Sequence, residues 1–170
     1  MSVSLPSGRY QLDPGTSEVR IQHRTIWGLV TVKGRFTEVA GLGEVPTDGG
    51  SASGTLTMTA ASLDTGHAKR DAHLRSADFF DTERFPELVF TADEAKAQSD
   101  GTVEIAGRLT VHGVTEPLTL SGTVTGRTDQ GVTVAVETVV DRDRFGLGWN
   151  RMGMLKGLTT VTVSATFTRA

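Results

Sequence analysis

The 170-residue sequence has no cysteine and few aromatic residues, which make up 6% of the chain. Without cysteine, disulfides and thiolate metal sites are excluded, and nothing can be inferred about the redox compartment. No segment approaches the roughly 18 consecutive apolar residues of a membrane-spanning helix. The net charge of −3 is mild, and no long basic run is present. A nucleic-acid partner and a polybasic membrane anchor are therefore not expected.

Common catalytic and metal-binding spacings are also missing. The sequence contains no HExxH, no GxSxG, no P-loop and no GxGxxG that opens a helix. We therefore expect no metal, no cofactor and no catalytic residue. The histidines lack the spacing of metal ligands: His23, His67, His73 and His112. Four carboxylates alternate with cations and are interpreted as solvated: Asp64, Asp71, Asp78 and Asp81.

What the chain does contain is alternation of apolar and polar residues, interrupted by turn signals. In one such segment, Val19, Ile21 and His23 share one face. About eight strands follow one another, mostly through hairpin turns, and one of them is expected to run from Val32 to Val45. No βαβ rhythm is present, so the sheet should be antiparallel. At this length the chain should form one domain over residues 1–170.

One buried face per strand fits either a sandwich or a closed barrel. Glycines inside the strands, such as Gly34 and Gly41, permit the bends of a closed sheet and favour the barrel. An eight-stranded barrel either fills with side chains or encloses one slim ligand. Because the inward residues are mostly small and aliphatic, we expect a cavity for an apolar guest.

The composition changes character between Thr65 and Pro86, where charged residues precede several phenylalanines. Helix formers predict a short, largely solvated helical insertion over about residues 66–81. Two compatible interpretations stay open, a helical connection that caps the core and the mouth of a ligand cavity. Arg70 and Asp71 are adjacent and point about 100° apart, so each is expected to find its own partner. We interpret them as scaffolding rather than as catalytic residues.

A second unusual segment, from Arg142 to Gly157, mixes apolar and basic residues. Its cations could place donors beside the polar head of a ligand, such as a diphosphate. The alternative is a solvated loop with cations that extend into water. The candidate head-group contacts are Arg144, Arg151 and Lys156.

Several motifs follow one another along the chain: YQLDPGTSEVRIQHR at 10–24, GRF at 34–36, SLDTGHAKRDAHLRSADFFDTERFPELVF at 62–90, GRLTVHGVTEPLTL at 107–120 and DRFGLG at 143–148. Together they resemble the YceI-like family of polyisoprenoid-binding proteins. Their number and order make the resemblance more specific than a single motif would. It implies an all-β, lipocalin-like antiparallel barrel of eight strands that holds a long-chain amphipathic lipid without turnover.

The expected ligand is a polyisoprenoid, with a quinone or a fatty-acid derivative as further options. The expected role is carriage or storage, and a homodimer is left open. One alternative is an isomerase or hydrolase that acts on a lipophilic substrate, with His23 or His73 as the base. Another is a ligand-free interaction module with no sizeable cavity. The residues expected to contact the lipid are Val19, Ile21, His23, Phe36, Leu56, Met58, Leu74, Phe79, Phe80, Phe90, Leu109, Val111, Leu120, Val134, Val136, Trp149, Met152, Leu155 and Val161.

The N-terminal residues lack both the charged region and the apolar region of a secretion signal. We therefore expect the chain as written to be cytoplasmic. Many proteins of the resembled family carry a signal and are periplasmic. The initial Met followed by Ser-Val-Ser favours a leaderless member over a trimmed chain.

Overall fold

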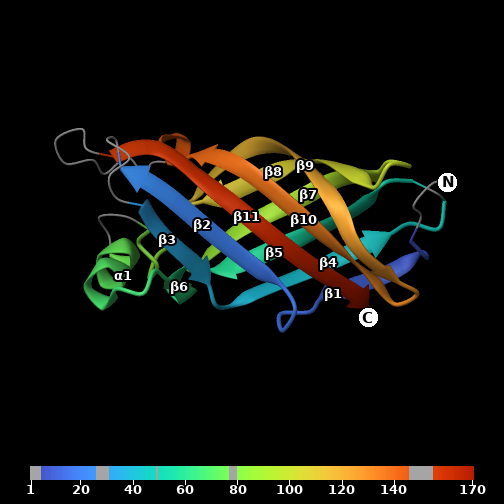
Figure 1. Ribbon diagram of the computed structural model, residues 1–170, viewed down its shortest axis with the longest axis horizontal. Coiled ribbons are helices and arrows are strands. Elements are labelled where there is room, and N and C mark those ends of the chain that lie inside the picture. The colour runs from blue at the N-terminus through green and yellow to red at the C-terminus, as the bar shows by residue number, and fades with distance from the viewer. Residues whose placement is uncertain (1–4, 26–30, 49, 77–79, 146–154) are drawn as a thin grey trace.

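The computed structural model describes residues 5–25, 31–48, 50–76, 80–145 and 155–170; the side chains of residues 24, 25, 142, 143 and 155–157 lie outside the description. Within these ranges the chain is mostly β-strand with one α-helix (Figure 1). The elements are β1 (Gly8–Leu12), β2 (Glu18–Thr25), β3 (Thr31–Phe36), β4 (Val39–Val45), β5 (Ala52–Thr59), η1 (Ala60–Ser62), β6 (Leu63–Asp64), α1 (Ala68–Arg75), β7 (Glu87–Ala97), β8 (Thr102–Val111), β9 (Val114–Thr128), β10 (Gly131–Asp141), η2 (Arg142–Phe145) and β11 (Leu155–Arg169).

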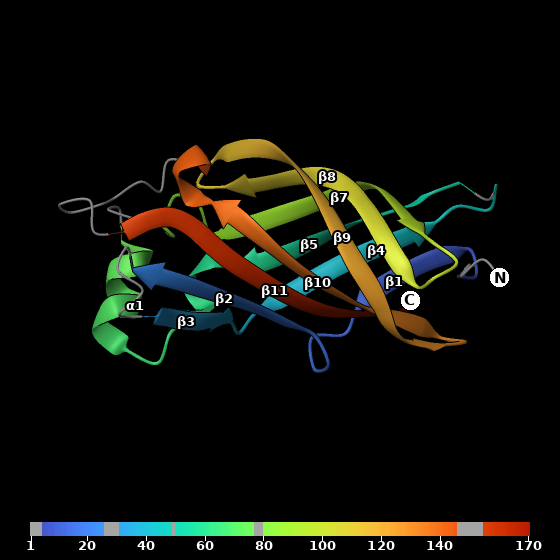
Figure 2. The ribbon, with the colours of Figure 1, turned by 45° about the horizontal axis from the view of Figure 1, so that its top comes forward.

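The sheet closes on itself as an antiparallel barrel. This confirms the barrel that the glycines inside the strands favoured over a sandwich. Neighbouring strands follow the order β1, β4, β5, β7, β8, β9, β10, β11, and β11 pairs again with β1. This ring has eight members, which confirms the predicted strand number. The views in Figures 1 and 2 show an elongated barrel with α1 at one end and the N-terminal residues at the other.

Two walls of the barrel are interrupted rather than continuous. The long strand β11 pairs with β2 along one part and with β1 along another, so β1 and β2 together form one wall. The prediction of a single strand from Val32 to Val45 is wrong, because that segment divides into β3 and β4. At the break, the Thr37 amide donates to the Ser62 carbonyl at 3.1 Å, and the Glu38 carbonyl accepts from the Thr59 amide at 3.0 Å. These bonds join the break between β3 and β4 to the residues in and beside η1.

The predicted helical insertion is confirmed, but α1 spans only residues 68–75 of the predicted interval 66–81. His67 caps its first turn by accepting a hydrogen bond from the Arg70 amide at 3.2 Å. At the other end, the Ser76 hydroxyl bonds the His73 carbonyl at 2.6 Å and competes with continuation of the helix. No helix in the described ranges has the length and apolar character needed to cross a membrane.

The tightest packing lies toward the α1 end of the barrel. There, Phe36 of β3 pairs with Leu63 of β6, and the chain around them brings in phenylalanines from the α1 connection and from η2. We call this group the packed cluster; its members are Val19, Phe36, Met58, Ala60, Leu63, Phe80, Leu88, Val111 and Phe145. The rest of the lumen is not filled in this way.

Candidate functional site

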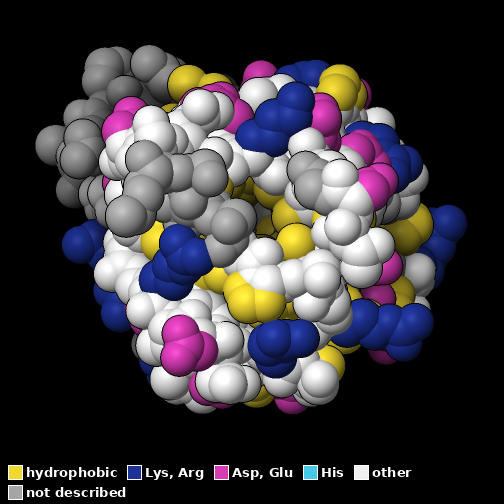
Figure 3. Space-filling model, turned by 90° about the vertical axis from the view of Figure 1, so that its right-hand side faces the viewer, with side chains coloured by type: hydrophobic (Ala, Val, Ile, Leu, Met, Phe, Trp, Pro, Cys, Tyr) yellow, Lys and Arg dark blue, Asp and Glu magenta, His cyan; other side chains and the backbone are white. Residues whose placement is uncertain are grey.

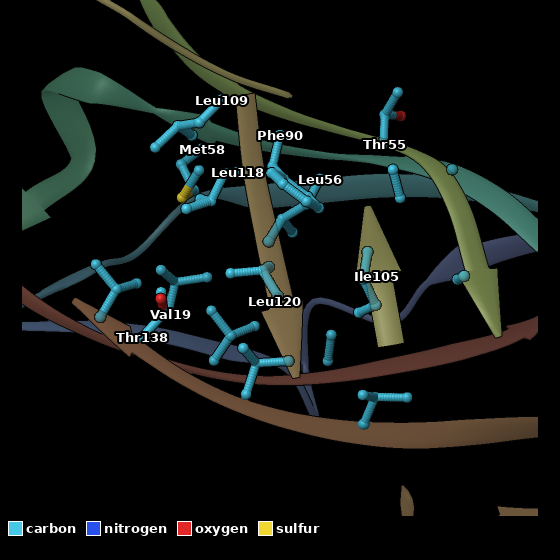
Figure 4. Close-up of a pocket in the computed structure, with 18 of the residues that line it drawn as sticks. Val19, Thr55, Leu56, Met58, Phe90, Ile105, Leu109, Leu118, Leu120 and Thr138 are labelled. Atoms are coloured by element: carbon cyan, nitrogen blue, oxygen red, sulfur yellow. The ribbon is translucent and has the colours of Figure 1, made fainter. Parts of the chain in front are cut away.

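A cavity of about 1110 Å³ occupies the interior of the barrel. Aliphatic side chains from most of the strands project into it, among them Met58, Ile105, Leu118 and Leu120 (Figure 4). From the end that carries the N-terminal residues, the molecule is hollowed, with hydrophobic side chains visible in the depression (Figure 3). The expectation that small aliphatic residues leave the lumen partly vacant is therefore confirmed.

Most of the residues expected to contact a ligand do line this cavity. They are Val19, Ile21, His23, Phe36, Leu56, Met58, Leu74, Phe80, Phe90, Leu109, Val111, Leu120, Val134, Val136 and Val161. Phe79, Trp149 and Met152 lie outside the described residues, as does the side chain of Leu155. Their contact with a ligand stays a prediction. The alternation along the strands was thus a sound guide to the inward face.

Several further residues line the cavity that were not among the predicted ligand contacts, although the sequence pattern marked them. Ile105, Leu118, Val124, Val132, Val163, Ala165 and Phe167 lie on inward faces that the alternation marked. Others had no such signal, because their strands or loops reach the lumen only through the fold: Tyr10, Val32, Leu63, Thr65, Arg70 and Phe145. His73, named above as a candidate base, lines the cavity as well. The second group matters more, since it brings polar side chains to the cavity.

Polar groups reach the cavity wall at the α1 end. His23 of β2 is 8% exposed, and its Nδ1 shares a hydrogen bond of 3.2 Å with the Thr159 hydroxyl of β11. The two residues are register partners on neighbouring strands, so the bond joins adjacent inward positions. Thr138 of β10 also lines the cavity. His23 was expected on the apolar face, and this placement is confirmed.

Thr65, Arg70 and Asp71 form a connected group beside this end of the cavity, which we call the Thr65 network. The Thr65 hydroxyl donates to the Asp71 carboxylate, and the Thr65 amide donates to the same carboxylate at 3.1 Å. Arg70 Nε donates to the Thr65 hydroxyl at 2.8 Å, and Arg70 Nη2 donates to the Thr65 carbonyl at 2.9 Å. Asp71 is only 6% exposed, so its interpretation as solvated is wrong. Arg70 and Asp71 were expected to find different partners, but both side chains form their hydrogen bonds with Thr65.

The polar residues at the opposite end of the cavity are of a different kind. Glu44, Lys96 and Gln98 line it near the β4–β5 and β7–β8 connections and are exposed. The Lys96 side chain is 61% exposed and pairs with Glu94 at 3.2 Å. The hydrogen bond from Lys96, followed by the one from the Ser51 hydroxyl, lowers the pKa of the Glu94 carboxyl group. These groups are exposed and lie at the hollowed end of the molecule rather than on a buried wall (Figure 3).

The predicted head-group cation Arg144 does not line the cavity. Its Nη2 donates to a Glu116 carboxylate oxygen on β9 at 2.9 Å, on the exposed surface of the barrel. Glu116 on β9 is too distant from Arg144 in the sequence to be predicted as its partner. Arg151 and the side chain of Lys156 fall outside the described residues. The solvated-loop alternative therefore fits Arg144.

A family model described as a YceI-like domain matches residues 10–168. The chain belongs to the YceI-like family. Its curated relatives include the UPF0312 protein plu2095 of Photorhabdus laumondii, 48% identical over 71 residues, and Protein YceI of Escherichia coli O157:H7, 45% identical over 74 residues. These matches cover 42% and 44% of this chain but only 36% and 38% of the two relatives. The aligned part thus spans little more than a third of either relative.

Several solved structures share the fold of this YceI-like protein, although their sequence identity to it is low. BcnA of Burkholderia cenocepacia aligns with a TM-score of 0.79 and 20% identity, over 91% of this chain and 98% of BcnA. A polyisoprenoid-binding domain from Saccharophagus degradans aligns with a TM-score of 0.77 and 16% identity, over 95% and 98% of the two chains. The YceI protein of Campylobacter jejuni aligns with a TM-score of 0.74 and 19% identity, over 84% of this chain and 87% of that protein. The barrel is therefore the family's fold.

Proposed function

We propose that this protein binds a long-chain amphipathic lipid in its barrel and carries or stores it without chemical change. A polyisoprenoid is the foremost candidate, and a quinone or a fatty-acid derivative would fit the same lumen. The observation that carries the proposal is the cavity of about 1110 Å³ with its aliphatic lining. The membership in the YceI-like family and the polyisoprenoid-binding neighbour support it.

The lumen suits a chain of methylene and methyl groups. Each methylene that leaves water for an apolar wall contributes about 0.8 kcal/mol, so a long chain gains several kcal/mol. Aliphatic walls carry few donors or acceptors that could select a compact polar ligand. A ligand-free interaction module predicted no cavity beyond a few water volumes, and the observed cavity contradicts that prediction.

The decisive experiment is extraction of the purified protein with organic solvent, followed by mass spectrometry of the extract. We expect at least one long-chain lipid in near-stoichiometric amount. An empty extract, combined with no uptake of an added polyisoprenoid, would contradict lipid binding. The extract also identifies the ligand class, since isoprenoids, quinones and fatty-acid derivatives differ in mass.

A pair of variants on one strand tests whether the lipid occupies the lumen. Val134 of β10 lines the cavity, whereas Val139 of the same strand is 55% exposed. Val134→Trp should lower lipid affinity about tenfold or more, because the indole occupies space that the chain needs. Val139→Trp is the matched control and should leave affinity unchanged. Equal losses in the two variants, measured by displacement of a fluorescent lipid, would place binding elsewhere.

The enzyme alternative is favoured by one specific observation, which is that both His23 and His73 line the cavity. An isomerase or hydrolase would alter the lipid during prolonged incubation with the protein. The non-catalytic function predicts that lipid is recovered with unchanged mass and retention time. A product that disappears in a His23→Gln or His73→Gln variant would replace carriage with catalysis.

A further inference from the structure

The Thr65 network gives the cavity a chemically distinct end. Arg70 is half-buried, lines the cavity and is held by bonds of 2.8 Å and 2.9 Å to the Thr65 hydroxyl and carbonyl. A guanidinium has five N–H donors, and these two bonds use only two of them. Among the described residues, Arg70 makes no other side-chain hydrogen bond, so donors remain for a partner in the cavity.

The guanidinium is fixed before any ligand arrives. Asp71 orients the Thr65 hydroxyl by accepting its hydrogen, which turns the oxygen lone pairs toward Arg70 Nε. The Thr65 amide bonds the same carboxylate, so the backbone of Thr65 is also restrained. Asp71 in turn sits in the first turn of α1, where a carboxylate is favoured by the helix dipole. A donor held in this way loses little entropy when it binds an acceptor.

The opposite end of the cavity lacks these properties. Lys96 is largely exposed and paired with Glu94, and Glu44 and Gln98 are exposed as well. Hydrogen bonds made in water exchange one polar partner for another and gain little, whereas those at a partly buried wall are stronger. The middle of the lumen is aliphatic. An amphipathic guest therefore finds its best-organised polar partner at the α1 end.

We propose that Arg70 is the anchor for the polar head of the bound lipid, with Thr65 and Asp71 as positioning residues. The head presents an acceptor oxygen, from a carbonyl or a carboxylate, to the remaining Arg70 N–H donors. The apolar tail then extends along the lumen toward the open end. This assignment rests on the proposed lipid-binding function and replaces Arg144, which faces the outside, as the head-group cation.

The test compares lipids that share one saturated isoprenoid skeleton and differ only at the head. The probes are phytane, which has no acceptor, methyl phytanate, which has a carbonyl, and phytanic acid, which has a carboxylate. Affinities are measured by displacement of a fluorescent lipid from delipidated protein. We expect Arg70→Met to weaken the two acceptor lipids about tenfold and to leave phytane unchanged. If Arg70→Met loses affinity for phytanic acid alone, the group that Arg70 binds is a carboxylate. If it loses affinity for both acceptor lipids, a carbonyl oxygen is sufficient. Either result supports Arg70 as the anchor.

The matched control is Arg75→Met on the same helix. Arg75 binds the Ala61 carbonyl at 3.0 Å and does not line the cavity. This variant should leave all three affinities unchanged. Arg70→Lys serves where Arg70→Met fails to fold, since it keeps the charge but not the guanidinium fork, and it should weaken only the acceptor lipids. If the Arg70 variants melt like the wild type and lower all three affinities equally, or none, the anchor is wrong.

The positioning role of Thr65 has its own readout. Thr65→Val keeps the side-chain shape but removes the hydroxyl between Arg70 and Asp71. It should weaken acceptor lipids several-fold without affecting phytane, and Thr65→Ser should restore them. A purely structural role would instead alter all three affinities together. If the wild type binds none of the probes and its extract is empty, the proposed function fails; if it binds them regardless of Arg70, only the anchor fails.

Discussion

The two halves of this barrel are built from the same kinds of residue but differ in how closely those residues pack. At the α1 end, the packed cluster brings aliphatic and phenylalanine side chains into close contact, and Leu63 is only 2% exposed. Farther along the lumen, Ile105, Leu118 and Leu120 also point inward, yet they remain partly accessible because the space between them is vacant. An inward position in a barrel is therefore not necessarily a packed one.

This difference in packing predicts which region contributes to stability and which to ligand binding. A closely packed side chain gains dispersion contacts on all sides, whereas one that borders a void forgoes part of them. The packed cluster should supply most of the stability, and the vacant lumen should supply ligand affinity. Substitutions in the two regions can separate these contributions.

The largest effect is expected from Leu63→Ala in the packed cluster. It removes a fully buried side chain and should lower the free energy of unfolding by about 3 kcal/mol. The matched variant Leu120→Ala in the lumen should cost about 1 kcal/mol, since the Leu120 side chain is only partly buried whereas Leu63 is fully buried. Urea denaturation of the delipidated proteins measures both values. Equal losses would mean that the lumen is packed as tightly as the α1 end.

A smaller effect is expected at the hairpin turns of the two ends. Gly113 between β8 and β9 has φ of +75°, and Gly101 between β7 and β8 has φ of +90°. Alanine at either position is strained by about 1 kcal/mol. A Cβ at Gly113 would also lie 2.7 Å from the Phe85 ring, whereas a Cβ at Gly101 meets nothing within 4 Å.

Gly113→Ala should therefore be more destabilising than Gly101→Ala, by about a further 1 kcal/mol. The Phe85 ring has limited freedom to move aside, because it packs edge-on against His112 with centroids 4.7 Å apart. Thermal unfolding of the two variants provides the comparison. Identical melting temperatures for the two variants would show that the Phe85 ring moves aside at no cost when a Cβ is added at Gly113.

The smallest effect is expected from Asp100 in the β7–β8 turn at the open end. The Thr102 hydroxyl donates to this carboxylate at 2.7 Å and the Thr102 amide at 3.0 Å, and these bonds lower the pKa of Asp100. A carboxylate with a lowered folded-state pKa stabilises the protein above its ordinary value of 3.8 and loses that contribution as the pH falls through the lowered value.

Asp100→Ala should thus lower the melting temperature slightly near neutral pH, and the difference from the wild type should shrink in strong acid. Melting curves over a pH series measure this. A difference that persists unchanged in strong acid would show that the side chain acts through turn geometry rather than through its charge.

Much of the fold follows from local sequence pattern. The alternation of Val161, Val163, Ala165 and Phe167 predicted their shared face, and the helix formers around Ala72 predicted α1. The predicted head-group site was less accurate, since the Arg144 side chain pairs with Glu116. Arg144 lies in the short element η2, which is too brief to show a periodicity, so sequence alone does not tell which way its side chain points.

The sequence by itself determined the antiparallel strands, their inward faces and the shortage of bulky residues that leaves the lumen vacant. These are local properties of side-chain period and volume. Only the tertiary structure decided that β11 pairs with both β1 and β2, that the Val32–Val45 segment breaks, and that Arg70 reaches the cavity wall. These features depend on contacts between residues far apart in the chain, and no local pattern encodes such contacts.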